Sequence, residues 1–397
     1  MTTAHETILG VLTQNAPIPA GIDPGRLVIW QERMGFSYQQ LRATIGGAIQ
    51  EVNLEMFANR GDMFYATPDQ SVWYPNGGDV VEFVQISGGG RVPLVHGGQA
   101  GHMIPLSPWG LGIGGDWRTI ADMTMARILS SAKGIVAAGR DLFERSVLNR
   151  AFDPTEFLLG ATGYNVPFCN GSPNSGSGGP KYAPLKWGGY VFDYTHNHFL
   201  AVSSGTTNPI TGSAFGGSVN YGSGLEALAF LIAEHGFGGN YKALISEADT
   251  VTVRGLANYV QPVSTIPWQD RGGLTSGPIY AENKEYGDIQ AMGDRYVGAY
   301  NSAYGLIDLY ANTRIPANYA CVYRPGSTLN PANALAVRYR PEFGLGFKIN
   351  DIPNEQTTFP VKEIDIEFEF GVSCGQNREM GAVMEFGASS YAIPTIL

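Results

Sequence analysis

Residues 60–115 restrict the possible folds more than any other part of the chain. Glycine recurs throughout this segment and forms clusters at 77–78, directly after Asn76, and at 88–90. Short strand-like runs at 80–86 and 91–96 flank the second cluster, which predicts a β-hairpin. A hairpin is barely stable alone in water, and an irregular segment of this length is unusual inside a compact domain. We therefore expect this segment to gain its burial against another chain.

Three other segments have the pattern of helices. The longest, 117–153, repeats apolar residues every 3.6 positions and ends before Pro154. At about 1.5 Å per residue this helix would be about 50 Å long, which is well above the average. A second helix is expected to begin at Ser37, and a third to run from Ser223 to Gly236. Each start has the spacing of a capping box: Ser37 and Gln40, Thr119 and Asp122, Ser223 and Glu226.

The C-terminal part has the clearest strand pattern. In the predicted strand at 359–371, isoleucine and phenylalanine alternate with aspartate and glutamate over 364–370, which predicts one apolar and one acidic face. A partner strand is predicted at 380–387, after a turn at 375–377. Further predicted elements are strands at 241–246, 305–310 and 319–323 and a helix at 250–259. The mixture of separate helices and strands indicates an α+β fold.

Composition and charge exclude several functions. The chain of 397 residues has 35 acidic and 25 basic side chains, so a broad basic surface for nucleic acid is not expected. No apolar run approaches the ~18 residues of a membrane-spanning helix. The three cysteines, Cys169, Cys321 and Cys374, are too widely spaced for a zinc motif. We expect them to be buried thiols of a protein in a reducing compartment.

One motif suggests an enzyme. Glu363, Asp365 and Glu367 alternate along the predicted strand, so their carboxylates share one face. This spacing resembles the catalytic signature of β-glucanases, whose retaining members need two carboxyl groups about 5–5.5 Å apart. In those enzymes the sheet continues well beyond the motif, whereas here the chain ends 30 residues after Glu367. We therefore favour a solvated acidic face and keep a glycosidase as an alternative.

Two further motifs offer weak candidates for binding. His196 and His198 would share a strand face, but the sequence shows no third metal ligand, so ordinary hydrogen-bonded histidines are favoured. The glycine-rich stretch 110–115 precedes the long helix but lacks the phosphate-loop pattern, and we interpret it as a flexible joint. No catalytic, cofactor-binding or metal-binding residue is predicted.

The order of these elements resembles that of the major capsid proteins of tailed bacteriophages, which have the Hong Kong 97-like fold. The resemblance begins at about residue 36 and depends on the character of successive segments rather than on one short signature. The segments are LGIGGDWRTIAD at 111–122, AEHGF at 233–237, YGLIDLYANTRIP at 304–316 and LAVR at 335–338.

This resemblance implies a Hong Kong 97-like capsid fold with five parts. They are an N-terminal arm and short helix at 1–57, an extended loop with a β-hairpin at 58–115, the long spine helix of a peripheral domain at 116–159, a mainly axial domain with an insertion at 160–345, and the return strands of the peripheral domain at 346–397.

The resemblance also implies a function. The chain would be a major capsid protein that self-assembles, through pentamers and hexamers, into the icosahedral shell around the double-stranded DNA of a tailed phage. It would not be an enzyme and would need no cofactor. Its expected partners are copies of itself, with scaffolding, portal and decoration proteins; it would enclose DNA without sequence-specific binding and would contact no membrane. Its expected location is the virion, after assembly in the host cytoplasm.

Two features depart from the type member of that family. There, a lysine in the extended loop forms a covalent crosslink to a neighbour, but residues 60–115 contain no lysine here, so no such crosslink is expected. The arm before Ser37 is short, so we expect any scaffolding to come from a separate protein. The alternatives are an encapsulin-type shell, although encapsulins are usually shorter, a tail tube subunit, and the glycosidase.

Overall fold

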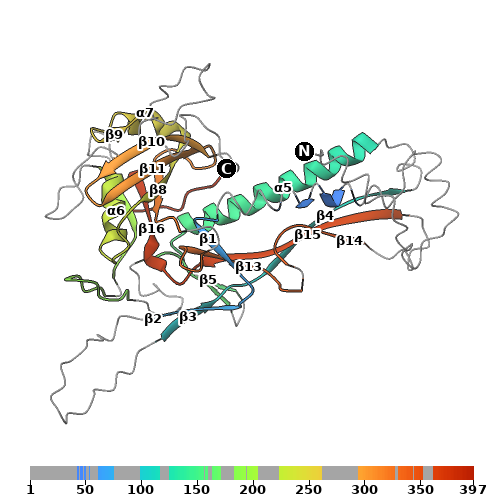
Figure 1. The fold of residues 1–397 in the computed structure, drawn as a ribbon, viewed down its shortest axis with the longest axis horizontal. Helices are drawn as coiled ribbons and strands as arrows, with labels where there is room; N and C mark the ends of the chain where they lie inside the picture. Colours follow the sequence, from blue (N-terminus) through green and yellow to red (C-terminus); the bar gives the residue numbers. More distant parts are fainter. Residues whose placement is uncertain are drawn as a thin grey trace, which may run out of the picture. The chain divides into compact units, whose positions relative to one another are not determined.

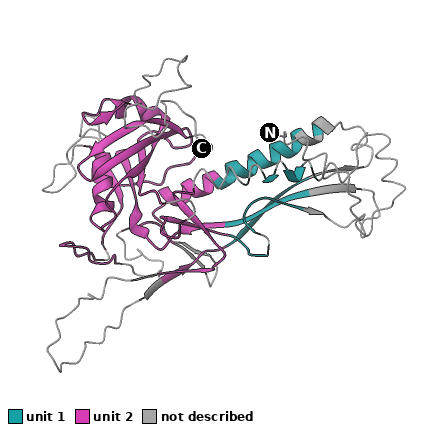
Figure 2. Ribbon diagram, viewed as in Figure 1, with its two compact units in different colours: residues 1–57, 106–143, 339–370 teal, residues 58–105, 144–338, 371–397 magenta. Residues whose placement is uncertain are grey.

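The computed structural model divides into two compact units (Figure 2). Unit 1 consists of Met1–Phe57, Leu106–Phe143 and Tyr339–Phe370, and unit 2 consists of Ala58–Pro105, Glu144–Arg338 and Gly371–Leu397. The structure describes residues 61–75, 99–116, 125–155, 157–159, 163–170, 183–193, 195–203, 223–261, 294–326, 330–342, 344–351 and 361–397, with part of 43–53. The division into five parts that the sequence suggests stays a prediction.

The sheet of unit 1 is built on the long strand β15 (Val361–Cys374). Its first ten residues pair antiparallel with all of β4 (Ser107–Asp116), and its other edge pairs with β14 (Lys348–Asp351). The interpretation of 110–115 as a flexible joint is therefore wrong, because these glycines form part of β4. At Gly110 an added Cβ would lie 3.3 Å from the side chain of Glu367, so the small residue lets the strand pass close to its neighbour.

Alternation along β15 separates the core of unit 1 from its surface, as predicted. Ile366, Phe368 and Phe370 are buried, whereas Glu367 between them is exposed. The ring of Phe368 lies 5.7 Å from that of Phe143, 4.8 Å from that of Phe347 and 4.5 Å from that of Phe370, measured between centroids. These four aromatic rings form a connected cluster in unit 1.

The long helix is also confirmed over its described length. Helix α5 (Met125–Phe152) ends one residue before Asp153, whose side chain accepts a hydrogen bond from the Thr155 amide at 2.8 Å. Its predicted start at Thr119 lies outside the described residues. No helix in the described segments is both long and apolar enough to cross a membrane. The described helical positions at 43–53, within the helix expected to begin at Ser37, include Ile45 and Ile49, which are both buried.

Unit 2 contains a mixed sheet of seven strands (Figure 1). In order across the sheet they are β7 (Phe199–Ser203), β16 (Gly381–Gly387), β12 (Tyr319–Tyr323), β8 (Tyr241–Ser246), β11 (Gly305–Asn312), β10 (Arg295–Ser302) and β9 (Tyr259–Val260). Strands β8, β11 and β12 were predicted from the sequence. The predicted helix at 250–259 is shorter, because α7 (Thr250–Arg254) follows the 3₁₀ turn η1 (Glu247–Asp249) and stops before β9.

Helix α6 (Gly224–Ala233) packs its apolar stripe against this sheet (Figure 1). Leu225, Leu228, Ala229 and Ile232 are all fully buried in one cluster with side chains of the central strands. Ser223 caps the helix as predicted, because its hydroxyl accepts a hydrogen bond from the Glu226 amide at 3.2 Å.

The predicted pairing of the two C-terminal strands is wrong. The last residues of β15 pair with β13 (Leu335–Arg338), whereas β16 pairs with β12 and β7 in the seven-stranded sheet. The 3₁₀ turn η4 (Arg378–Met380) separates them, and its Arg378 side chain is buried. The guanidinium Nε of Arg378 donates to the Pro167 carbonyl at 2.9 Å. This buried anchor directs the chain into a different sheet instead of closing a hairpin.

Smaller ladders complete unit 2. Strand β1 (Phe64–Thr67) pairs parallel with β13, β2 (Ser71–Pro75) pairs antiparallel with β3 (Gln99–Met103), and β5 (Phe157–Leu159) pairs antiparallel with β6 (Gly163–Asn165). The predicted hairpin at 80–96 lies outside the described residues. Strands β2 and β3, which precede and follow it in the sequence, pair antiparallel with each other.

Candidate functional site

The carboxylates of the possible glycosidase motif lie on the surface of unit 1. Glu367 is exposed and Asp365 is partly exposed, whereas the side chain of Glu363 lies outside the described residues. The opposite face of β15 carries the buried aromatic side chains. Farther along the acidic face, the Glu369 carboxylate forms an ion pair with the Arg340 guanidinium, with 2.8 Å between the Nη2 and Oε1 atoms. This arrangement fits the solvated acidic face that the sequence analysis favours.

The three cysteines are free and buried, as predicted. Burial raises the pKa of Cys374 to about 11 and raises that of Cys169 well above its ordinary value. Because the thiolate is the reactive form, the raised pKa values keep Cys169 and Cys374 as unreactive thiols.

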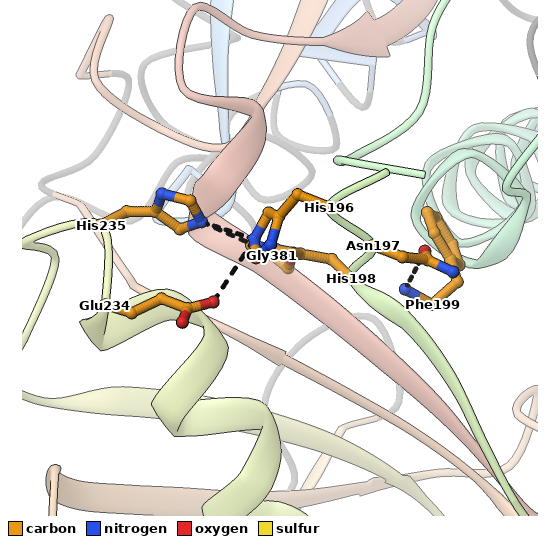
Figure 3. Close-up of polar contacts among 7 residues, drawn as sticks. All are labelled: His196, Asn197, His198, Phe199, Glu234, His235 and Gly381. Atoms are coloured by element: carbon orange, nitrogen blue, oxygen red, sulfur yellow. Dashed lines mark hydrogen bonds and ion pairs between the residues drawn. The ribbon is translucent and has the colours of Figure 1, made fainter. Parts of the chain in front are cut away.

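The histidines that the sequence suggested only weakly are brought together in unit 2 with two further residues (Figure 3). His196 and His198 precede β7, while Glu234 and His235 lie in the turn that ends α6. The Nε2 atom of His196 lies 2.9 Å from that of His198 and 2.8 Å from that of His235. Its distance to the carboxylate of Glu234 is 3.4 Å. We call these four residues the histidine cluster.

Local backbone contacts position the histidine cluster. The amide of His198 donates to the Cys169 carbonyl at 2.7 Å, and the Asn197 side chain accepts from the Phe199 amide at 2.8 Å. On the other side, the Glu234 amide continues the hydrogen bonding of α6 to Phe230. The His198 Nδ1 atom lies 2.8 Å from the Gly381 carbonyl oxygen of β16. Three segments distant in sequence therefore fix the cluster.

The surroundings of the histidine cluster disfavour charge. Burial lowers the pKa of His196 to about 4 and that of His235 to about 3, and it lowers the pKa of His198 well below its ordinary value. Burial also raises the pKa of Glu234 to about 7. The ring of Phe192 contributes to this apolar environment, with its centroid 4.0 Å from that of His235. The three imidazoles are neutral at pH 7.

Of the four residues in the histidine cluster, the sequence pattern paired only His196 and His198. The spacing of His196 and His198 indicated a shared face, and the structure confirms that their rings converge. His235 was missed as a neighbour because it is 39 residues from His196. Only the packing of α6 on the sheet brings that turn beside β7, and no local pattern reports such a contact.

In sequence, no family model matches the chain, and no curated protein matches it. In structure, a solved chain from Mycobacterium phage Patience matches 96% of this chain and 97% of that chain, with a TM-score of 0.58 and 20% identity. The capsid of the native GTA particle covers 84% of this chain, and the mature capsid of bacteriophage PhiM1 covers 83%. The GTA match covers 91% of that chain at 10% identity, and the PhiM1 match covers 87% of that chain at 11% identity. Both matches have a TM-score of 0.42.

The match to the Patience chain shows a common fold. It extends over nearly the whole length of both chains.

Proposed function

We propose that this chain is the major capsid protein of a tailed bacteriophage and that it acts as a structural subunit without enzymatic activity. The observation that carries the proposal is the fold shared with the chain from Mycobacterium phage Patience over 96% of this chain. The order of elements along the sequence supports the same function independently, because it resembles that of the major capsid proteins of tailed bacteriophages. The shell encloses double-stranded DNA, and the net charge of −10 suits enclosure without specific binding.

The proposal assigns the units to the parts of a Hong Kong 97-like subunit. The sheet of β4, β14 and β15, together with α5, corresponds to the peripheral domain. The seven-stranded sheet with α6 corresponds to the axial domain. Strand β16 belongs to the latter sheet, and on this proposal residues 381–387 would form part of the axial domain.

Exposed apolar side chains support assembly. Trp73 on β2 is 60% exposed, and on β4 Trp109 is 45% exposed and Leu111 55% exposed. Large apolar side chains that stay accessible in one chain are typical of surfaces that another subunit covers. Since β2 lies within the predicted extended loop at 58–115, Trp73 lies where the sequence analysis expects contact with a neighbouring chain.

The proposal predicts that the purified chain assembles. Negative-stain electron microscopy and sedimentation should show closed shells, or pentamers and hexamers that close into shells. Shell diameter then separates a phage capsid from a smaller encapsulin-type particle. A chain that stays a 42.6 kDa monomer across assembly conditions contradicts the proposal, and β-glucan hydrolysis lost on Glu367→Gln would support the glycosidase alternative instead.

A second prediction concerns covalent bonds between subunits. Residues 60–115 lack lysine, so this loop cannot supply the amine of an isopeptide bond. Mature particles boiled in SDS should therefore migrate as a single band at the monomer mass. A ladder of covalent multimers that persists after reduction would show that another lysine crosslinks the shell.

A further inference from the structure

We propose that the histidine cluster is a binding site for a divalent transition metal of the zinc class. The ligands are the Nε2 atoms of His196, His198 and His235, together with the carboxylate of Glu234. The ion would crosslink the end of α6 to the segment before β7. The proposal does not depend on capsid assembly, because all four residues belong to unit 2.

The spacing of the nitrogen atoms fits a metal ion. The third separation, between the Nε2 atoms of His198 and His235, is 3.2 Å, so the three atoms form a nearly equilateral triangle. Ligands 2.0–2.1 Å from a tetrahedral zinc ion are about 3.3 Å apart. An ion slightly above the plane of the three nitrogen atoms therefore needs only small movements of the rings. All candidate ligand atoms lie within 4.8 Å of one another.

Hydrogen bonding alone does not account for this convergence. A neutral imidazole has one N–H. Nδ1 of His198 donates its proton to the Gly381 carbonyl, so its Nε2 has only a lone pair. At most two protons, from His196 and His235, remain for three nitrogen–nitrogen contacts of 2.8, 2.9 and 3.2 Å. At least one contact therefore has no hydrogen bond, whereas a central cation would use all three lone pairs.

The carboxylate of Glu234 independently indicates a cation at the histidine cluster. Its Oε1 atom is buried and has no hydrogen-bond partner among the residues that the structure describes. Leaving a buried carboxylate oxygen without a donor is unfavourable, because the oxygen loses its hydrogen bonds to water and gains none in return. The same oxygen lies 3.4 Å from Nε2 of His196, on the side where the ring nitrogens converge. A cation at that place would satisfy it.

The donor set selects the class of metal. Three imidazole nitrogens and one carboxylate suit Zn²⁺, Co²⁺, Ni²⁺ or Cu²⁺, whereas Mg²⁺ and Ca²⁺ prefer oxygen ligands. Four protein ligands leave no open position, which is typical of a structural zinc site. The bond from His198 to the Gly381 carbonyl fixes the ring with its Nε2 toward the centre, as second-sphere partners of zinc ligands do.

Cobalt binding to the untagged full-length chain tests the proposal. After metals are removed with a chelator, added Co²⁺ should produce the intense visible absorption of tetrahedral coordination and saturate at about one ion per chain. Added Zn²⁺ should displace it. His196→Ala should weaken binding by about 100-fold or more, since loss of a direct ligand exceeds the 10–100-fold effect of second-sphere changes.

The matched control is His102→Gln. His102 is also buried in unit 2, and its Nε2 contacts the Cys374 carbonyl at 3.1 Å, a bond that a glutamine amide can donate. This variant should bind Co²⁺ like the wild type. The proposal is overturned if the wild-type chain gives no tetrahedral spectrum, or if His196→Ala and His102→Gln bind Co²⁺ equally. Even if His196→Ala does not fold, the wild-type titration shows whether the chain binds Co²⁺ with tetrahedral coordination.

Discussion

Replacing Gly305 by alanine should destabilise the chain by about 3 kcal/mol or more, one of the largest effects expected from a single methyl group in this protein. Gly305 begins β11 directly after the two-residue turn that joins it to β10. Its φ of +143° is a conformation that residues with a side chain rarely adopt. In addition, an alanine Cβ would lie 1.7 Å from the Gly239 carbonyl oxygen.

The turn has little freedom to move away from this clash. Its Ala303 amide donates to the Glu226 carboxylate at 2.9 Å, and Glu226 is itself fixed in the first turn of α6. The Ser302 hydroxyl donates to the Gly305 carbonyl at 2.7 Å. Relief of the clash would therefore break hydrogen bonds that join the hairpin to the helix.

Gly239→Ala is the matched control for this prediction. Gly239 has a similar φ of +136°, but an added Cβ meets nothing within 4 Å. This variant should show only the conformational cost, about 1–3 kcal/mol. Urea denaturation of both variants at one protein concentration, followed by tryptophan fluorescence, measures the difference. Equal free energies of unfolding would contradict a steric contribution at Gly305.

Features set by short-range sequence patterns were predictable. The cap of α6 follows from Ser223 and its spacing to Glu226, and the buried stripe of that helix follows from its apolar period. Strand β8 was predicted with the bounds that the structure shows, because its apolar run is short and flanked by polar residues. In each case the residues that determine the local structure lie within about ten positions of one another in the sequence.

Features that depend on distant residues were not predictable. The glycines of β4 have weak strand propensity, and they form a strand because β15 offers a ten-residue partner from the other end of the chain. Strand β16 joins the seven-stranded sheet instead of pairing with β15, because the Arg378 side chain is hydrogen-bonded to the carbonyl of Pro167, more than 200 positions earlier. The histidine cluster likewise needs Glu234 and His235, which only tertiary packing brings to His196.

Strand β15 provides the second large effect. Phe368→Ala should destabilise the chain by about 3–5 kcal/mol, because the substitution removes a buried ring and leaves a cavity. The Phe368 ring contacts three other aromatic side chains, Phe143, Phe347 and Phe370, so no single neighbour can fill the space. Urea denaturation measures the loss, and Phe368→Leu should recover part of it.

Glu367→Gln, at the adjacent position on the opposite face, is the control. Glu367 is exposed, and the substitution keeps its size, so we expect the free energy of unfolding to change by no more than about 0.5 kcal/mol. The pair of variants separates the two interpretations of this strand. If it is a structural strand, stability depends on Phe368 and nothing measurable depends on Glu367. If Glu367→Gln instead abolished hydrolysis of a β-glucan by the wild-type chain, the acidic face would be a catalytic surface and the capsid proposal would fail.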